Sequence, residues 1–388
     1  MTYSMNDLKR NLKAAGLAAL TLAACARAVL AGGPGSAGMQ VLKLDTSPRA
    51  AGMGGAFVAV ADNIYTMSYN PAGLGQLYVP EATAMHLSGF DDSSLQYFSY
   101  GMPLPFIGLG GLQKPAAGFS VLMANAGNFN YKYIMPDGSI LSHSFDAQKD
   151  LVLTLGYGEK VYSDEVNLEG YNAKIEQYLG MNAKYIRSVL LEDKEPPSTF
   201  AFDAGWLLTE PRLGLSLGAS VANYGGGLKY GTEVTKLPSI LRLGAAYQRP
   251  TVMDQSLLLA AEGDFYTNES LHSLRLGLEY HFEKIFNLRL GYKGGEDNKG
   301  MTMGIGIHYE DMALDFAMGM GNEVYNASQV AFSYKFSGIK VKEYRKKVSY
   351  KDPQPEKPSK TRAPSKQPRK PARTAPEKKK DSDFFWIY

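Results

Sequence analysis

The stretch LRLGLEYHFEKIFNLRLGYK, residues Leu274–Lys293, alternates apolar and polar residues with a period of two. In its first half one face holds Leu274, Leu276, Leu278, Tyr280 and Phe282, and the other holds Arg275, Gly277, Glu279 and His281. In its second half Phe286, Leu288, Leu290 and Tyr292 oppose Asn287, Arg289, Gly291 and Lys293. A period of two with this separation predicts β-strands that have one apolar and one polar face.

The same pattern repeats from about Glu81 to Phe336, interrupted by turns rich in Gly, Asn, Asp and Pro. About fourteen strands are expected, an even number, as bacterial barrels require. They lie near 82–90, 95–104, 116–126, 150–161, 178–189, 200–209, 212–224, 237–249, 256–266, 271–282, 285–293, 301–309, 312–320 and 329–336. The segment Phe129–Phe145, with Pro-Asp-Gly at its middle, is expected to form an extra hairpin in a long loop.

The direction of the apolar face separates two fold classes. In a soluble sandwich the apolar face points to the core, whereas in an outer-membrane barrel it points to lipid and the polar face lines the lumen. Tyr or Phe stands near many strand ends, as an interfacial aromatic girdle requires. A closed barrel also satisfies every backbone hydrogen-bonding group in lipid, which an open sheet does not. We therefore expect an all-β transmembrane barrel that contacts outer-membrane lipid.

Residues 1–31 are expected to be an export signal. Lys9, Arg10 and Lys13 precede the short apolar run Ala14–Ala26, which is too short to span a bilayer as a helix. Cleavage before Gly32 suits an ordinary signal peptidase. However, the four residues ending at Cys25 resemble a lipobox, so lipidation of Cys25 is the alternative. Because Cys25 is the chain's single cysteine, no disulfide can form within one chain.

A Gly- and Ala-rich segment, RAAGMGGAFVAVADNIYTMSYNPAGLG (Arg49–Gly75), precedes the strands. A fourteen-stranded barrel has a lumen too wide for lining side chains alone to fill, so residues 32–80 are expected to form a hatch that plugs it. Arg49 and Asp62 would pair with lumen charges, and Pro71 after Asn70 would fix a turn into the first strand. The expected hatch residues are Arg49, Gly52, Gly54, Gly55, Asp62, Asn70, Pro71, Ala72 and Gly73.

These residues carry a resemblance to a known family. Arg49–Ala56, Val58–Asp62 and Asn70–Leu74 resemble the opening of the PorV/PorQ outer-membrane proteins, which are related to FadL-like transporters. Leu213–Gly231 and Leu237–Tyr247 agree with it, and the resemblance covers roughly Met39 to Phe336. It implies a fourteen-stranded barrel over residues 81–336 with an N-terminal hatch.

The resemblance leaves the function open between two classes. PorV-like members hold secreted cargo proteins during type IX export, and FadL-like members pass hydrophobic small molecules inward. We favour cargo handling because the match is closer there. FadL-like uptake and a purely structural, envelope-linking barrel are the alternatives. None of these functions calls for a cofactor.

The composition changes after Phe336. Residues 337–388 carry sixteen Lys and Arg against six Asp and Glu, a net charge of +10, together with seven prolines. The whole chain is +3 and the signal is +3, which leaves −10 for residues 32–336. The tail is expected to be disordered, periplasmic and attracted to anionic partners such as peptidoglycan or an acidic periplasmic protein. Its last five residues look like a docking peptide: Phe384, Phe385, Trp386, Ile387 and Tyr388.

Motifs for catalysis or metal binding are not apparent. The five histidines have no metal-ligand spacing, and Gly52-Met53-Gly54-Gly55 lacks the spacing and the βαβ context of a phosphate loop. Nucleic acid is an improbable partner for the basic tail because an exported chain would not meet it. We therefore expect no enzyme, no metal and no catalytic residues.

Overall fold

The computed structural model describes residue 33 and residues 35–89, 92–168, 171–190, 195–250, 255–283, 285–295, 299–321 and 327–338. The expected signal, with Cys25, lies outside the described residues. So does the tail from residue 339 onward, including the expected docking residues Phe384–Tyr388.

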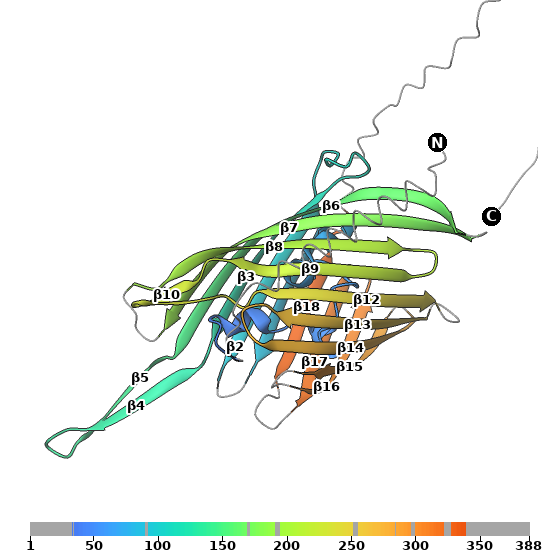
Figure 1. Cartoon of the computed structure of the whole chain (residues 1–388). Helices are drawn as coiled ribbons and strands as arrows, with labels where there is room; N and C mark the ends of the chain where they lie inside the picture. The colour runs from blue at the N-terminus through green and yellow to red at the C-terminus, as the bar shows by residue number, and fades with distance from the viewer. Residues whose placement is uncertain are drawn as a thin grey trace, which may run out of the picture. The chain divides into compact units, whose positions relative to one another are not determined.

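Fourteen strands form one closed antiparallel barrel, which confirms the predicted fold class (Figure 1). Its strands are β1 (Glu81–Ser88), β2 (Ser94–Pro103), β3 (Ala116–Asn125), β6 (Gln148–Leu168), β7 (Tyr171–Leu190), β8 (Ser198–Glu210), β9 (Leu215–Gly225), β12 (Ile240–Pro250), β13 (Ser256–Tyr266), β14 (Leu271–Phe282), β15 (Phe286–Gly294), β16 (Gly300–Tyr309), β17 (Met312–Gly321) and β18 (Ser328–Lys335). The barrel closes between β1 and β18, in a register that runs from Glu81 opposite Lys335 to Ser88 opposite Ser328.

The polar strand faces point inward and the apolar faces outward. On β14 the lumen side chain Arg275 is 1% exposed, whereas the next residue outward, Leu276, is 43% exposed. On β15 Arg289 is 1% exposed and Leu288 is 56% exposed. An apolar outer wall around a charged interior is the arrangement that lipid requires. The sequence alternation is therefore that of a membrane barrel, and the soluble sandwich is excluded.

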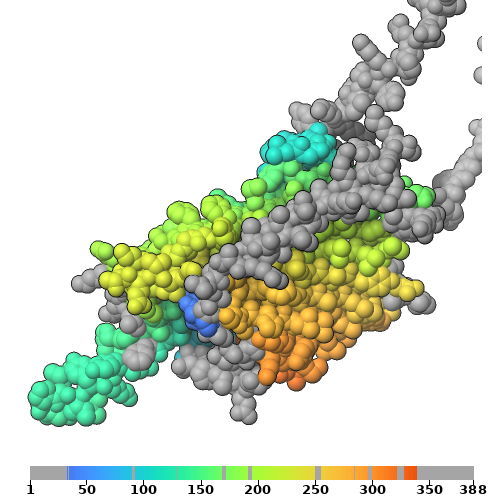
Figure 2. Space-filling model, viewed as in Figure 1, coloured from blue at the N-terminus to red at the C-terminus, as the bar shows by residue number. Residues whose placement is uncertain are grey.

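Two hairpins depart from the barrel. β4 (Asn128–Ile134) pairs with β5 (Ile140–Asp146) where an extra hairpin was expected, and it projects away from the wall (Figure 2). β10 (Leu228–Tyr230) pairs with β11 (Glu233–Thr235), a small hairpin that the sequence pattern did not reveal. β6 and β7 run about ten residues longer than expected, with a register irregularity between Lys160 and Tyr162. We call the end that carries β4–β5 and β10–β11 the hairpin end.

At the opposite end, which we call the turn end, β1 begins and β18 finishes. Short segments such as 211–214, 283–285 and 310–311 join neighbouring strands there, together with one longer connection, 104–115. The segment 126–147 at the hairpin end is much longer. The two ends of the barrel therefore differ in the length of their connections.

Residues 35–80 lie inside the barrel ahead of β1 and are called the hatch from here on (Figure 1). The hatch contains η2 (Gln40–Lys43), α2 (Pro48–Gly52), α3 (Thr66–Tyr69) and η3 (Pro71–Gln76). α2 begins where the Ser47 hydroxyl accepts the Ala50 N–H, with Pro48 at the first helical position. η3 contacts β6, β7 and β8, and α2 contacts β15 to β18, so the hatch touches opposite sides of the wall. Within the described residues, no helix has the length and apolar character needed to cross a membrane.

Glycines on the inner wall face the hatch. A Cβ atom on any of them would lie within 3.0 Å of a hatch atom; they are Gly101, Gly118, Gly156, Gly158, Gly180, Gly205, Gly218, Gly244, Gly277 and Gly291. Gly180 is the register partner of both Gly158 and Gly205. Because neighbouring strands place these glycines side by side, parts of the inner wall carry no side chains. The hatch backbone lies directly against these parts.

We predict that Gly291→Ala destabilises the barrel. The new Cβ would overlap the Gly54 nitrogen and the Met53 carbonyl carbon, and such overpacking costs about 1–3 kcal/mol. Gly263→Ala is the matched control, since its Cβ would meet only the Phe265 ring at 3.4 Å. Urea unfolding of the purified barrel, followed by its mobility in unheated gels, measures both variants. Equal urea midpoints for the two variants would refute the close contact at Gly291.

Candidate functional site

Arg49 on α2 ties the hatch to the wall. Its Nε donates to both carboxylate oxygens of Glu279 on β14, at 3.1 and 2.9 Å, and its NH2 donates to Oε1 at 2.7 Å. Its NH1 donates to Asp62 at 2.5 Å, and its guanidinium lies 5.6 Å from the ring centre of Phe57. Arg49 therefore meets the lumen charge expected of it. Asp62 does not, because it pairs with Arg49 inside the hatch.

The Arg49 network continues into the wall. Glu279 also accepts the Arg289 Nε at 2.6 Å, and the Arg289 NH1 donates to Asp315 on β17 at 2.6 Å. The side chains of Glu279 and Arg289 are fully buried. Removing one member of a buried ion pair leaves an uncompensated charge, which costs about 3–5 kcal/mol. These alternating charges therefore couple hatch position to three wall strands.

A second network holds the hatch closer to the hairpin end. Asp45 accepts Lys293 at 2.5 Å and Arg275 at 3.3 Å. Burial raises the pKa of Asp45, but Lys293 and Arg275 outweigh it and lower the pKa to about 2. A carboxylate with a lowered pKa stabilises the fold above its ordinary pKa near 4, and loses that contribution as the pH falls towards 2. Asp45 therefore stays charged at any pH near neutrality.

Backbone groups of the hatch also bind a wall carboxylate. The N–H groups of Phe57 and Val58 both donate to Glu262 Oε2 on β13, each at 2.7 Å. Arg242 lies 3.8 Å from the other oxygen of Glu262. Two consecutive N–H groups on one carboxylate fix the hatch chain locally without using a hatch side chain.

Three of the four expected hatch glycines, Gly52, Gly54 and Gly55, lie close to the wall, whereas a Cβ on Gly73 would meet Ala61 and Thr66 of the hatch itself. A Cβ on Gly52 would lie 3.0 Å from the Gly304 Cα, and one on Gly54 would lie 2.7 Å from the Tyr292 carbonyl oxygen. Gly54 and Gly55 have φ of +68° and +84°, a conformation that other residues adopt at a cost. Glycine is therefore required at these two positions for conformation as well as for space.

The Asn-Pro-Ala-Gly segment is buried against β8. Asn70 Nδ2 donates to the carbonyls of Val58 at 2.8 Å and of Trp206 at 3.0 Å, and its Oδ1 accepts the Ala72 N–H at 3.2 Å. Pro71, Ala72 and Gly73 follow as the buried start of η3. Asn70 therefore joins two parts of the hatch to the wall, a role beyond the turn that the sequence predicted.

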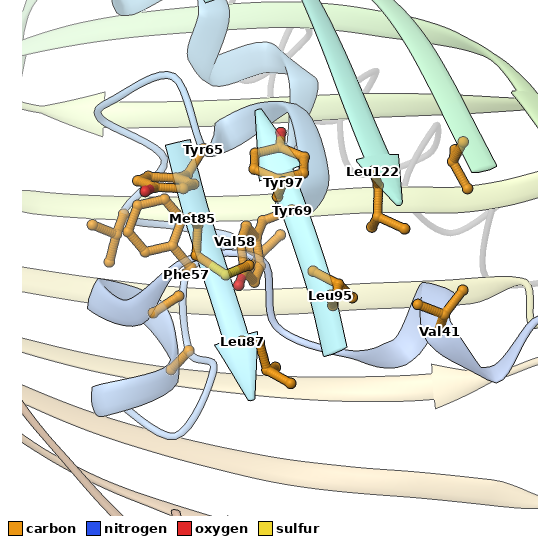
Figure 3. Close-up of a cluster of buried hydrophobic side chains, with 14 of the residues drawn as sticks. Val41, Phe57, Val58, Tyr65, Tyr69, Met85, Leu87, Leu95, Tyr97 and Leu122 are labelled. Carbon is orange, nitrogen blue, oxygen red and sulfur yellow. The ribbon is translucent and has the colours of Figure 1, made fainter. Parts of the chain in front are cut away.

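Apolar side chains of the hatch pack on β1 and β2. Figure 3 shows Phe57, Val58, Tyr65 and Tyr69 of the hatch beside Met85, Leu87, Leu95 and Tyr97 of these strands. The Tyr65 and Tyr97 rings are stacked with their centres 6.1 Å apart. Val41, nearer the hairpin end, belongs to the same cluster. The hatch is thus held by an apolar contact on one side and by ion pairs on the other.

A cavity of about 440 Å³ opens between the hatch and the wall at the hairpin end, and we call it the hairpin-end cavity. Its apolar lining comes from the hatch and from β1, β2, β3 and β7, and includes Met39, Val41, Leu44, Leu87, Leu95 and Leu190. Its polar lining includes Gln40, Ser94, Asn125, Gln148, Asp150 and Tyr230. The hatch supplies one side of this cavity and the barrel wall supplies the other.

A second cavity, of about 410 Å³, lies at the turn end between the hatch and β7, β8, β9, β12 and β13. Tyr78, Tyr178 and Leu258 line it together with Asp62 and Glu176. The hatch therefore separates two cavities at opposite ends of the barrel.

Within the part of the chain that the structure describes, no three His, Cys, Asp or Glu side chains come together as a metal site. Sequence reasoning placed Glu279 and Arg289 on the polar face but did not foresee their link to Arg49. It missed Asp45 and Glu262 as hatch contacts. One feature of the sequence could have indicated these contacts. Gly277 and Gly291 lie on the same strand face as the charges, and glycine is not expected there in a lumen filled by its own side chains.

No protein-family model matches the sequence. No curated protein matches it either. Among solved structures, the toluene transporter TbuX of Ralstonia pickettii is 12% identical, with 75% of this chain and 98% of that chain covered and a TM-score of 0.49. The toluene transporter TodX of Pseudomonas putida is 12% identical, with 78% and 96% covered and a TM-score of 0.46. The outer membrane protein Omp33 of Acinetobacter baumannii is 6% identical, with 68% and 100% covered and a TM-score of 0.39. At these identities and TM-scores the likenesses do not transfer a function to this chain.

We predict that Arg49→Met loosens the hatch. Glu279 and Asp62 lose a shared buried partner, so stability should fall by about 3–5 kcal/mol and channel openings should appear in planar bilayers. Deletion of residues 39–75 gives the conductance of an unplugged barrel for reference.

Arg212→Met is the control for Arg49→Met. Arg212 forms an exposed pair with Glu165, and such pairs contribute only about 0–1 kcal/mol. If both arginine variants stay as closed and as stable as the parent, the Arg49 network does not hold the hatch.

Proposed function

We propose that this barrel is an outer-membrane uptake channel for small hydrophobic molecules and that the hairpin-end cavity is its capture site. The observation that carries the proposal is the cavity itself. It measures about 440 Å³, within the range of about 300–1,000 Å³ typical of small-molecule sites. Most of its lining is apolar, and a few polar groups are available to orient a ligand. This reverses the ranking that the sequence favoured, in which cargo handling came first.

The hatch favours a channel that takes up specific ligands rather than an open aqueous pore. Its residues Phe57, Met67 and Leu74 are at most 1% exposed, so the middle of the lumen is packed like a protein core. A molecule that enters the hairpin-end cavity must therefore move the hatch or pass around it. Such a barrier admits ligands that bind and excludes bulk solutes.

The orientation of the barrel favours capture from outside. Bacterial outer-membrane barrels have short periplasmic turns and longer extracellular loops. The hairpin end carries the longest connection, residues 126–147, and the turn end carries mostly short turns such as 310–311, with one longer connection, 104–115. We infer that the hairpin-end cavity faces the medium and that the turn end, with the start of the tail, faces the periplasm.

We predict that Ala124→Phe blocks uptake. Ala124 lines the hairpin-end cavity, and a benzyl group there would take up ligand volume. Toluene is a suitable probe because TbuX and TodX transport it. Accumulation of labelled toluene by cells that express the barrel should fall about tenfold or more, since even small changes in apolar fit are worth about 10–200-fold.

Ala117→Phe, seven residues away on the lipid-facing side of β3, is the matched control and should leave uptake unchanged. Heat-dependent gel mobility checks that both variants are folded barrels. Uptake that is the same in Ala124→Phe as in the parent, or no uptake above cells without the barrel, would contradict the proposal.

PorV-like handling of secreted proteins is the second candidate, and the β4–β5 hairpin favours it. Tyr131 and Tyr133 share one face of this hairpin with Leu141 and His143, their register partners. These two tyrosines are 51% and 39% exposed. Aromatic residues are enriched where proteins bind one another, so this face suits contact with a cargo protein.

Replacing residues 128–146 by a short turn separates the two candidates. We predict that toluene uptake persists, because the hairpin does not line the cavity. A cargo handler without the hairpin should instead leave secreted proteins in the periplasm. Normal uptake with normal secretion supports the channel. A secretion defect in a strain whose parent barrel shows no hydrocarbon uptake would favour cargo handling.

A further inference from the structure

Asp150 on β6 is the one charged side chain among the described residues that line the hairpin-end cavity. It is 8% exposed, and its backbone register partners are Ala124 on β3 and Ser188 on β7. The other polar lining groups are amides, hydroxyls and a phenol. The described wall of this cavity therefore carries a single negative charge inside a mostly apolar space.

Among the residues that the structure describes, the Asp150 carboxylate has hydrogen-bond donors but no cationic partner. Gln148 Nε2 donates to its two oxygens at 3.0 and 2.9 Å, and Ser188 is its other hydrogen-bonding neighbour. None of the described lining residues is a Lys, Arg or His. Buried carboxylates are ordinarily paired with a cation, as Glu279 and Asp45 are in this lumen. Asp150 differs from both because the space beside it is an open cavity.

A ligand can supply the missing cation. A protonated amine on a small apolar body would place its ammonium group against Asp150 and its hydrocarbon part against Leu87, Leu95 and Leu190. Tyr230 lines the same cavity, and an aromatic face adds a favourable interaction with an ammonium group. A carboxylic acid would bring a second negative charge into this low-dielectric space and would be disfavoured.

We propose that Asp150 makes the hairpin-end cavity selective for hydrophobic amines over neutral hydrocarbons and acids of the same shape. The proposal rests on the uptake function above and specifies its substrate class. Asp150 would act as a specificity-determining residue that touches the ligand directly. It would not be required for the cavity to hold an apolar molecule.

Equilibrium dialysis of the purified full chain in nanodiscs tests the selectivity, with protein-free nanodiscs subtracted. The probes are 2-phenylethylamine, propylbenzene, 2-phenylethanol and 3-phenylpropionate, which share a ring and a short chain. The amine should bind about tenfold to a hundredfold tighter than propylbenzene, the range expected of one charge-assisted hydrogen bond. Asp150→Asn should remove this preference and leave propylbenzene binding within about twofold of the parent.

Asp146→Asn is the matched control, because Asp146 also lies at the hairpin end but pairs with Lys149 and does not line the cavity. It should leave all four affinities unchanged. The selectivity proposal would be overturned if the alcohol bound as tightly as the amine, or if the amine preference survived in Asp150→Asn. In either case, binding of propylbenzene would still uphold the uptake function. If neither propylbenzene nor the amine binds the parent, the proposed function fails and the selectivity fails with it.

Discussion

A fourteen-stranded barrel encloses more space than its own lining side chains can fill, and this chain meets that constraint by laying hatch backbone directly on the wall. The contact is possible because both surfaces lack side chains where they meet. Gly52 of the hatch faces Gly304 of β16, and Gly54 faces Gly291 of β15. Backbone in such contact brings its own N–H and C=O groups, which must be satisfied. The N–H groups of Phe57 and Val58 donate to Glu262, and the Val58 carbonyl accepts a hydrogen bond from the Asn70 side chain.

Close packing against glycines alone would leave the hatch free to slide along the inner wall, and the charges fix its position. Arg49 pairs with Glu279, Glu279 also pairs with Arg289, and Arg289 also pairs with Asp315. Moving α2 therefore disrupts a connected set of buried ion pairs. A buried ion pair is a poor source of net stability but a strong penalty against displacement. The networks therefore specify where the hatch sits more than they stabilise it.

The strand pattern was predictable because a barrel in lipid imposes a strict period of two, which the Leu274–Lys293 stretch displays in full. Fourteen strands and the outward apolar face followed from it. The hatch partners did not follow, since no local pattern says that Arg49 meets Glu279 rather than another lumen carboxylate. Asp62 shows the same limit, because its partner was near in sequence and not across the lumen. The extension of β6 and β7 beyond the wall was missed because those residues alternate too weakly to be read as strand.

The cavities were beyond prediction for a related reason, since each is bounded by segments far apart in the chain. Met39 and Leu44 of the hatch face Leu87 and Leu190 of the wall across the hairpin-end cavity. A ligand held there would contact hatch and wall together, so its affinity depends on where the hatch sits. This dependence is reciprocal. If a ligand binds more tightly when the hatch is in one position than in another, its binding shifts the hatch towards that position, by a free energy equal to the difference between the two binding free energies. Under the proposed uptake function, the residues that hold the hatch in place, Arg49 among them, would influence ligand affinity without touching the ligand.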